Sequence, residues 1–327
     1  LAMPELSGLD VSKINQIYYV ACGTAYHASL YAQYLLRTWI DLPIYCISAS
    51  EFRYGNYRID ENTLCIFVSQ SGETADTLAA LKLSKENKAQ TLSVTNVLGS
   101  SLARLSDYVL YTCAGPEIAV ASTKAYTTQL VLLACLCLKL ASLFNKCVVC
   151  KNHMINQLKQ MPDAVEQMLA QEEKMAEFAK LLTNQKDAYF IGRQLDYLSV
   201  LEGALKLKEV SYVHADAYMA GELKHGPIAL IEKDTVVIAL ATQPSVAQKT
   251  ISNILETAAR GAKVILIASQ SQNTEGFEYV IRIPDVDPLL SCIPATVLLQ
   301  ELAYYVAKEK GCDVDKPRNL AKSVTVE

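Results

Sequence analysis

The chain has 327 residues, with 30 lysines and arginines against 34 aspartates and glutamates, a formal net charge of −4 at pH 7. This length is about twice that of an ordinary domain, so we expect two domains. A slightly acidic protein is a poor match for nucleic acid or an anionic membrane, whereas a small anionic substrate can still bind through local donors. Hydrophobic residues make up 51% of the chain and charged residues 20%, a balance typical of a globular protein with a sizeable core.

Ten cysteines are present, and most lie in apolar runs such as 133–138, where a free thiol behaves as a small core residue. We read no signal peptide in the sequence, so we expect a reducing, cytoplasmic compartment rather than a disulfide framework. The longest helix-like run without charge, 125–138, is too short to cross a bilayer and predicts a buried core helix.

Cys147 and Cys150 form a lone C-x-x-C pattern. A structural zinc site needs two further ligands at suitable spacing, and His153 would supply only one of them. A redox pair is typical of a helix start after a strand, whereas this pair follows a predicted helix. We therefore expect neither a metal nor a cofactor.

Short runs rich in β-branched residues alternate with helix-like segments, which is typical of βαβ units and a parallel sheet covered by helices. Strands are predicted in the first half at 17–21, 44–47, 64–69, 91–95 and 108–112. In the second half they are predicted at 188–191, 213–217, 236–241, 263–268 and 279–283. Each half ends with a long apolar helix, predicted at 123–144 and at 294–310.

The two halves repeat the same order of elements. The run 66–71, a helix and the strand 91–95 are echoed by the run 237–242, a helix from Ser245 and the strand 264–268. We therefore predict an α/β protein made of two tandem, doubly wound parallel-sheet domains, each with three α/β/α layers. The predicted bounds are 1–150, 151–310 with a polar helical linker (151–182) at its start, and 311–327 for a C-terminal tail.

The turn after the predicted strand 64–69 is rich in hydroxyl groups. Ser69, Ser71 and Thr74 surround Gly72, which lets the backbone turn tightly before a helix predicted to begin at Ala75. Parallel sheets bind ligands at the carboxyl ends of their strands, and a helix N-terminus adds free N–H groups and a partial positive charge. An ordinary N-cap would explain one hydroxyl, but three around a glycine favour a phosphate site without lysine or arginine.

Two further polar loops precede predicted helices. Thr24 lies in the loop after the first predicted strand, at the same edge of the sheet. Residues 120–123 precede a long helix and by themselves indicate no more than a helix cap. Neither the dinucleotide fingerprint nor the P-loop pattern occurs in the sequence.

Charged residues in the second half form a possible catalytic group. A helix predicted over 201–209 places Glu202, Lys206 and Glu209 at i, i+4 and i+7, on one face. Composition alone favours a solvated stripe of salt bridges, but this helix follows the first strand of the second copy, near the expected ligand edge. His225 lies among glycines and a proline, in either a shaped loop or an ordinary surface position.

The C-terminal tail leaves two interpretations open. Residues 316–323 are basic and include Lys322, and the chain finishes with the apolar run 324–326 before Glu327. A basic tail alone indicates disorder, whereas the apolar finish indicates a segment that docks.

Five segments together closely resemble the C-terminal isomerase half of the glutamine–fructose-6-phosphate aminotransferase family, and the duplicated unit resembles the sugar isomerase (SIS) domain. These segments are 69–74, 121–124, 202–209, 221–227 and 317–327. The resemblance covers nearly the whole chain. It implies conversion of fructose 6-phosphate to glucosamine 6-phosphate, with ammonia from a glutaminase domain. It implies isomerisation of fructose 6-phosphate to glucose 6-phosphate by this chain alone.

The resemblance also implies which residues bind the sugar phosphate. The phosphate would be held by Ser69, Gln70, Ser71 and Thr74. The sugar would be lined by Thr24, Val120, Ser122 and Ala321.

Four further residues would carry the chemistry, according to the same resemblance. Glu209 would be the base that moves a proton between C1 and C2, and Lys206 would assist near the same oxygens. The partner subunit's His225 would open the sugar ring, which implies a homodimer with a shared active site. Lys322 would form a Schiff base with the C2 carbonyl. Aldose–ketose isomerisation does need a carboxylate base and an acid near the ring oxygen, and a Schiff base needs an amine.

The chain departs from the family pattern in two ways. Ala25 stands where many relatives carry a serine, so one hydroxyl contact is lost. The glutaminase domain is absent, so we expect this chain to be part of a longer protein and unable to release ammonia from glutamine. A phosphosugar-sensing module and a standalone sugar-phosphate isomerase or deaminase remain the alternatives.

Overall fold

The computed structural model describes residues 2–146 and 151–326, so Cys147 and Cys150 lie outside the described residues. The chain forms two compact units. The first comprises Leu1–Ile118, Lys124–Asn152 and Ala321–Glu327, and the second comprises Ala119–Thr123 and His153–Leu320. The domain bounds given above, at 150 and 310, stay a prediction.

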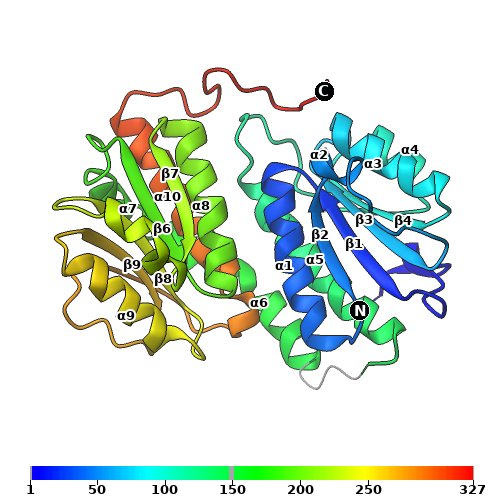
Figure 1. Cartoon of the computed structure of the whole chain (residues 1–327), viewed down its shortest axis with the longest axis horizontal. Coiled ribbons are helices and arrows are strands. Elements are labelled where there is room, and N and C mark those ends of the chain that lie inside the picture. Colours follow the sequence, from blue (N-terminus) through cyan, green and yellow to red (C-terminus); the bar gives the residue numbers. More distant parts are fainter. Residues whose placement is uncertain (1, 147–150, 327) are drawn as a thin grey trace. The chain divides into compact units, whose positions relative to one another are not determined.

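The first unit is built on a five-stranded parallel sheet with the order β2-β1-β3-β4-β5 (Figure 1). Its strands are β1 (Gln16–Ala21), β2 (Ile44–Ser48), β3 (Thr63–Ser69), β4 (Gln90–Thr95) and β5 (Tyr108–Tyr111). Every residue of the central strand β3 is buried, as expected for a parallel strand that is covered on both faces.

Helices cover both faces of this sheet. The helical elements are η1 (Pro4–Leu6), α1 (Gly23–Trp39), α2 (Ala49–Phe52), α3 (Ala75–Glu86), α4 (Ser101–Leu105) and α5 (Lys124–Leu143). On one face, Tyr18 and Phe67 join a core with residues of α2, α3 and α4. On the other, the Tyr19 hydroxyl lies 3.5 Å from the Cys137 Sγ of α5, and α1 packs against α5. The alternation of side chains along each strand therefore produces three layers.

The second unit repeats this plan. Its strands are β6 (Asp187–Gly192), β7 (His214–Met219), β8 (Val236–Ala241), β9 (Lys263–Ser269) and β10 (Tyr279–Ile283). They form a parallel sheet in the order β10-β9-β8-β6-β7. Counted from the first strand of each copy, both sheets have the order 2-1-3-4-5, a doubly wound order that places ligands at the carboxyl edge.

The helices of the second unit also form two layers. They are α6 (Lys151–Leu169), α7 (Glu172–Ala179), α8 (Leu195–Ser211), η2 (Glu222–His225), η3 (Pro227–Leu230), α9 (Ala247–Ala258), η4 (Pro288–Leu290) and α10 (Cys292–Glu309). One core joins α7, α8 and α10 to the sheet, and a second core joins the opposite face to α9. Gly203 allows α8 to lie close to α10, because a Cβ there would be 2.7 Å from Leu299 Cδ1.

All ten predicted strands are present, each within two residues of its predicted ends. The two copies share one topology, which confirms the predicted pair of doubly wound domains. The long apolar helices are also present, as α5 and α10.

The prediction about membrane length was wrong for one helix. Helix α5 has 20 residues, and it and the segment Pro288–Glu309 are both long and apolar enough to cross a membrane by length and composition. Within the fold, 56% of the most apolar 18-residue stretch of α5 is buried, and 72% of the corresponding stretch of Pro288–Glu309. Burial against a sheet, and not shortness, is what indicates that they are core helices. The eight cysteines in the described ranges are all free.

Candidate active site

The turn between β3 and α3 is held by its own hydroxyl groups. The Oγ of Ser69 accepts the Gly72 N–H at 3.1 Å and lies 3.2 Å from the Oγ1 of Thr74. The Oγ of Ser71 accepts the Glu73 N–H at 3.2 Å. The three predicted hydroxyls therefore do gather around the N-terminus of α3, at the carboxyl edge of the sheet.

Gly72 is required by the shape of this turn. Its φ is +67°, and a Cβ would lie 2.2 Å from the Ser100 Oγ and 2.9 Å from the Thr95 Oγ1. Any other residue would meet both strain and a clash. The Gly72 carbonyl also accepts the Leu102 N–H at 3.0 Å, which fixes the turn against α4.

The C-terminal tail lies on this turn. The Ser323 Oγ is 3.0 Å from the Ser71 Oγ, and the Val324 carbonyl accepts the Ala75 N–H at 3.0 Å. A helix N-terminus leaves its first N–H groups without intrahelical partners, and here the tail binds one of them. An anion that binds to the turn would compete with Ser323 and Val324 for the same donors.

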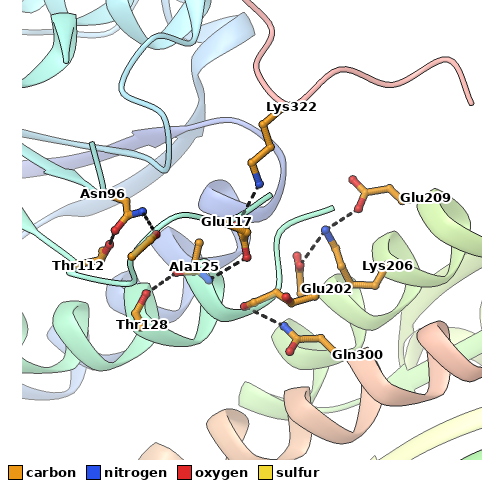
Figure 2. A network of polar contacts seen from close by, with 12 residues as sticks. Asn96, Thr112, Glu117, Ala125, Thr128, Glu202, Lys206, Glu209, Gln300 and Lys322 are labelled. Carbon is orange, nitrogen blue, oxygen red and sulfur yellow. Dashed lines mark hydrogen bonds and ion pairs between the residues drawn. The ribbon is translucent and has the colours of Figure 1, made fainter. Parts of the chain in front are cut away.

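Lys322, the residue before Ser323, is anchored in the same unit. Its Nζ lies 3.1 Å from the Oε2 of Glu117, a carboxylate whose side chain is only 4% exposed. Figure 2 shows the Lys322 side chain pointing at Glu117. Nothing in the sequence pattern indicated Glu117, because it lies in an irregular loop without helix or strand periodicity.

The remaining predicted residues of the first unit have less specific surroundings. Gln70 accepts the Asn96 N–H through its backbone carbonyl at 3.1 Å. Thr24 lies in the first turn of α1, which follows β1, the neighbour of β3 in the sheet, so it lies at the same carboxyl edge. Ala321 is exposed and precedes Lys322.

In the second unit, α8 carries a buried charge cluster. The Nζ of Lys206 lies 2.5 Å from the Oε2 of Glu209 and 3.4 Å from the Oε1 of Glu202 (Figure 2). Glu202 is fully buried and Lys206 is 2% exposed, whereas the Glu209 side chain is 22% exposed. The prediction of one shared face is confirmed, and the alternative of a solvated stripe is wrong.

Burial alone would lower the pKa of Lys206, but the carboxylates of Glu202 and Glu209 together raise it above its ordinary value. Lys206 is therefore a stable ammonium ion. It can hold Glu209 in place and donate to oxygens, but it is a poor choice of nucleophile.

A small cavity of about 160 Å³ opens beside Lys206 within the second unit. Its lining is apolar at Ala121, Val210 and Ala303 and polar at Gln300 and Asp315. Ligand pockets generally have volumes of roughly 300–1,000 Å³, so this cavity is too small for a hexose phosphate.

The other predicted residues of the second unit lie in loops. His225 ends η2 and is exposed, and it precedes Gly226, whose φ is +147°. The segment that contains Val120 and Ser122 is tied to the second unit, since Val120 donates its N–H to the Asp315 carbonyl at 2.9 Å. Gln300 also donates to the Thr123 carbonyl at 3.3 Å.

Asp196 is a residue that sequence reasoning missed. It lies in the first turn of α8, is 1% exposed, and accepts the Thr242 N–H at 2.8 Å and the Thr242 hydroxyl. Burial raises its pKa to about 6, against the hydrogen bonds from Thr242 and Gln243 that lower it. Thr242 follows β8, the counterpart of β3, so a carboxylate of the chain itself lies at the turn that corresponds to the hydroxyl-rich turn of the first copy.

A family model described as the SIS domain matches the chain twice, at residues 10–139 and 181–303. Each match contains one of the two five-stranded sheets. The glutamine–fructose-6-phosphate aminotransferase (isomerizing) of Clostridium tetani is 53% identical over 332 residues, which cover 99% of this chain and 54% of that protein. The chain thus spans about half the length of the curated relatives it matches.

Solved structures give the same picture. The C-terminal domain of glucosamine-fructose-6-phosphate aminotransferase from Francisella tularensis is 38% identical, with a TM-score of 0.89, and the match covers 94% of this chain and 87% of that one. The glucosamine-6-phosphate deaminase from Thermotoga maritima is 25% identical, with a TM-score of 0.78, and the match covers 98% and 95% of the two chains.

Proposed function

The chain belongs to the SIS domain family, and on that basis we propose that it is the sugar-isomerising half of a glutamine–fructose-6-phosphate aminotransferase. Its substrate is fructose 6-phosphate. With ammonia the product is glucosamine 6-phosphate, and without ammonia it is glucose 6-phosphate. The observation that carries the proposal is the hydroxyl-rich turn after β3, on which the tail with Lys322 is docked.

In this proposal the phosphate group binds at the N-terminus of α3. The hydroxyls of Ser69, Ser71 and Thr74 and the first N–H groups of the helix are the donors, and the Gln70 side chain completes the set. Their gathering around Gly72 supports this assignment, because donors at a helix N-terminus favour an anion without any nearby cation. Thr24, Val120, Ser122 and Ala321 line the sugar.

The proposed chemistry is a proton transfer between C1 and C2 of the open-chain sugar. Glu209 removes the proton from one carbon and returns it to the other, and His225 acts on the ring oxygen when the ring opens. The ion pair of Glu209 with Lys206 supports this role, because it fixes the base while Lys206 is left to stabilise the oxygens that gain charge. Lys322 forms the Schiff base with C2.

The proposal includes partners. A glutaminase domain supplies ammonia in the full-length protein, in accord with the relatives, which are about twice as long. The exposure of His225 on its loop is compatible with a role in the partner's site in a homodimer. We place the protein in the cytoplasm, on the pathway to amino sugars and UDP-N-acetylglucosamine, with neither nucleic acid nor membrane as a partner.

One assay tests the proposal directly. The chain is incubated with fructose 6-phosphate, and glucose 6-phosphate is followed by a coupled dehydrogenase. We expect steady formation of glucose 6-phosphate that the Glu209→Gln variant lacks. No product from a folded chain that binds fructose 6-phosphate would leave only a binding module.

The phosphosugar-sensing alternative has weaker support. A sensor needs the hydroxyl turn but has no use for a buried ammonium between two carboxylates. Burial of Glu202 and Lys206 costs free energy even though they are paired, so the cluster on α8 favours an enzyme.

A further inference from the structure

We propose that Glu117 positions the amine of Lys322 and accepts its proton before the amine attacks the sugar carbonyl. This inference rests on the proposed function, in which Lys322 forms the Schiff base. It adds a residue that the sequence pattern did not indicate and gives it a defined step in the reaction.

The geometry of the Glu117 carboxylate suits both tasks. Its Oε2 lies 3.1 Å from the Lys322 Nζ, while its Oε1 accepts the Ala125 N–H in the first turn of α5 at 3.2 Å. The two oxygens thus have separate partners, which Figure 2 shows on either side of the carboxylate. One oxygen is held by the backbone and the other faces the reacting amine.

The segments that carry the pair are both fixed to the same unit. Asn96, just after β4, receives the Thr112 hydroxyl at 3.0 Å and donates to the Gly115 carbonyl at 2.8 Å, which anchors the loop that leads to Glu117. On the other side, Ser323 and Val324 hold the tail on the β3–α3 turn. The lysine therefore meets Glu117 at the edge of the sheet where the phosphate is proposed to bind.

The proposed step balances. The ammonium of Lys322 gives a proton to the Glu117 carboxylate, and the free amine then forms a bond from nitrogen to C2 as the carbonyl π electrons move to oxygen. Glu117 returns the proton toward that oxygen, which leaves as water after it receives the second amine proton. The products are an iminium ion, water and the original carboxylate.

The burial of the Glu117 carboxylate makes this transfer reasonable. The Glu117 side chain is 4% exposed and the Lys322 side chain 29%. A buried charge is costly, whereas a neutral acid beside a neutral amine is not. A substrate that displaces the remaining water from Lys322 would therefore raise the cost of the charged pair and favour the transfer.

The test must separate proton transfer by Glu117 from a purely structural role of the same side chain. Glu117 also satisfies an N–H of the first turn of α5, and a carboxylate is favourable there because of the helix dipole. Glu117→Gln separates the two roles, because the amide oxygen still accepts the Ala125 N–H but the side chain can no longer take a proton. Glu117→Asp keeps the proton acceptor at a greater distance.

The experiment measures how fast the iminium forms. The 327-residue chain is mixed with fructose 6-phosphate and cyanoborohydride between pH 6 and 10, and the label on the peptide that carries Lys322 is followed by mass spectrometry. Asp107→Asn is the matched control. Asp107 also pairs with a lysine, Lys85, at 2.7 Å and accepts a backbone N–H, that of Thr91, at 2.9 Å. It lies just before β5, at the edge of the sheet opposite to the proposed phosphate site. Calorimetry measures the affinity for fructose 6-phosphate in every variant.

We expect Glu117→Gln to slow labelling at pH 7 by about 10-fold or more, with a steeper rise at higher pH, where solvent removes the proton instead. Affinity should stay within about twofold, Glu117→Asp should recover part of the rate, and Asp107→Asn should match the parent. Labelling of Glu117→Gln at the parental rate and pH profile, or faster, would overturn the inference and leave Glu117 as a helix cap or a brake. A parent chain that binds fructose 6-phosphate but gains no label on Lys322 would instead refute the Schiff-base role in the proposed function, and the inference with it.

Discussion

Lys206 is an ammonium ion enclosed by two carboxylates on one face of α8. The two carboxylates differ in exposure: Glu202 is fully buried, whereas the Glu209 side chain is 22% exposed. Of these two carboxylates, Glu209 is therefore the one that is accessible from solvent. Glu202 instead balances the positive charge of the buried Lys206. Glu209 therefore does not have to neutralise Lys206 alone and stays available as a base.

This difference predicts opposite effects of two matched substitutions. Glu209→Gln should lower the rate of isomerisation by roughly 10²- to 10⁴-fold, as loss of a general base does, with little change in stability. Glu202→Gln should mainly lower the free energy of unfolding, by up to about 3 kcal/mol, because it breaks a buried ion pair while Lys206 keeps Glu209. Coupled isomerase assays and urea unfolding measure the two effects. Equal losses of rate would argue against the assignment of Glu209 as the base.

Asp196 is the other buried acid with a defined consequence. Burial raises its pKa in the fold to about 6, from 3.8. A raised pKa means that the fold binds the proton more tightly than the unfolded chain. The resulting stability is fully present below pH 3.8 and is lost as the pH rises through 6.

We therefore predict that the parent loses about 1 kcal/mol of unfolding free energy between about pH 5 and pH 8, relative to Asp196→Asn. Urea unfolding across this range measures the difference. Asp107→Asn is a control of opposite sign: burial would raise the pKa of Asp107, but hydrogen bonds from Lys85 and Thr91 lower it. Parallel pH profiles for the parent and Asp196→Asn would show that Asp196 stays charged in the fold.

At the scale of elements, the two copies use the same turn differently. After β3, the turn with Ser69, Ser71 and Thr74 is bound by the C-terminal tail, through Ser323 and Val324. After β8, Thr242 is bound to the buried Asp196 and to the Ser291 hydroxyl, at 2.9 Å. An internal carboxylate in the second copy repels an anion, which is why the proposed phosphate site is assigned to the first copy.

This comparison predicts one fructose 6-phosphate per chain. Isothermal titration calorimetry of the parent should give a stoichiometry near one, because the second turn is blocked by charge and by hydrogen bonds already made. Two equivalent sites per chain would contradict it. One site that survives the combined substitutions Ser69→Ala and Thr74→Ala would place the phosphate elsewhere.

The hydroxyls of the first turn should dominate affinity. Ser69→Ala combined with Thr74→Ala removes two bonds to a charged group, which should cost about 3 kcal/mol or roughly 100-fold in Kd, with a smaller effect on turnover. Ser84→Ala is a control in the same helix, since the Ser84 hydroxyl donates to the Ala80 carbonyl inside α3 and is not part of the turn. Unchanged affinity in the double variant would exclude this turn as the phosphate site.

At the scale of the whole molecule, the proposal requires a shared site in a homodimer. Chains with His225→Ala and chains with Glu209→Gln should each be inactive, but a mixture should recover about a quarter of the parental activity. Half of the dimers are then hybrids, and one of the two sites in each hybrid has both residues. Native mass spectrometry confirms that hybrids form. Hybrids without activity would show that each chain supplies its own histidine.

The sequence by itself determined most of the fold. Ten short β-branched runs predicted the ten strands, because a parallel strand covered on both faces must be apolar along its whole length. The repeated order of these runs predicted two copies of one topology. The sequence also predicted the hydroxyl turn and the shared face of Glu202, Lys206 and Glu209, because both depend on local spacing along a turn or a helix.

Only the tertiary structure decided the electrostatics of these residues. Periodicity could not tell a solvated stripe from a buried cluster, because burial of Lys206 depends on the packing of α8 against elements far away in the sequence. Asp196 and Glu117 gave no signal, since each acquires its role from a partner that is distant along the chain, at Thr242 and at Lys322. Spacing is local and can be read from the chain, whereas desolvation and charge pairing arise only when the chain folds back on itself.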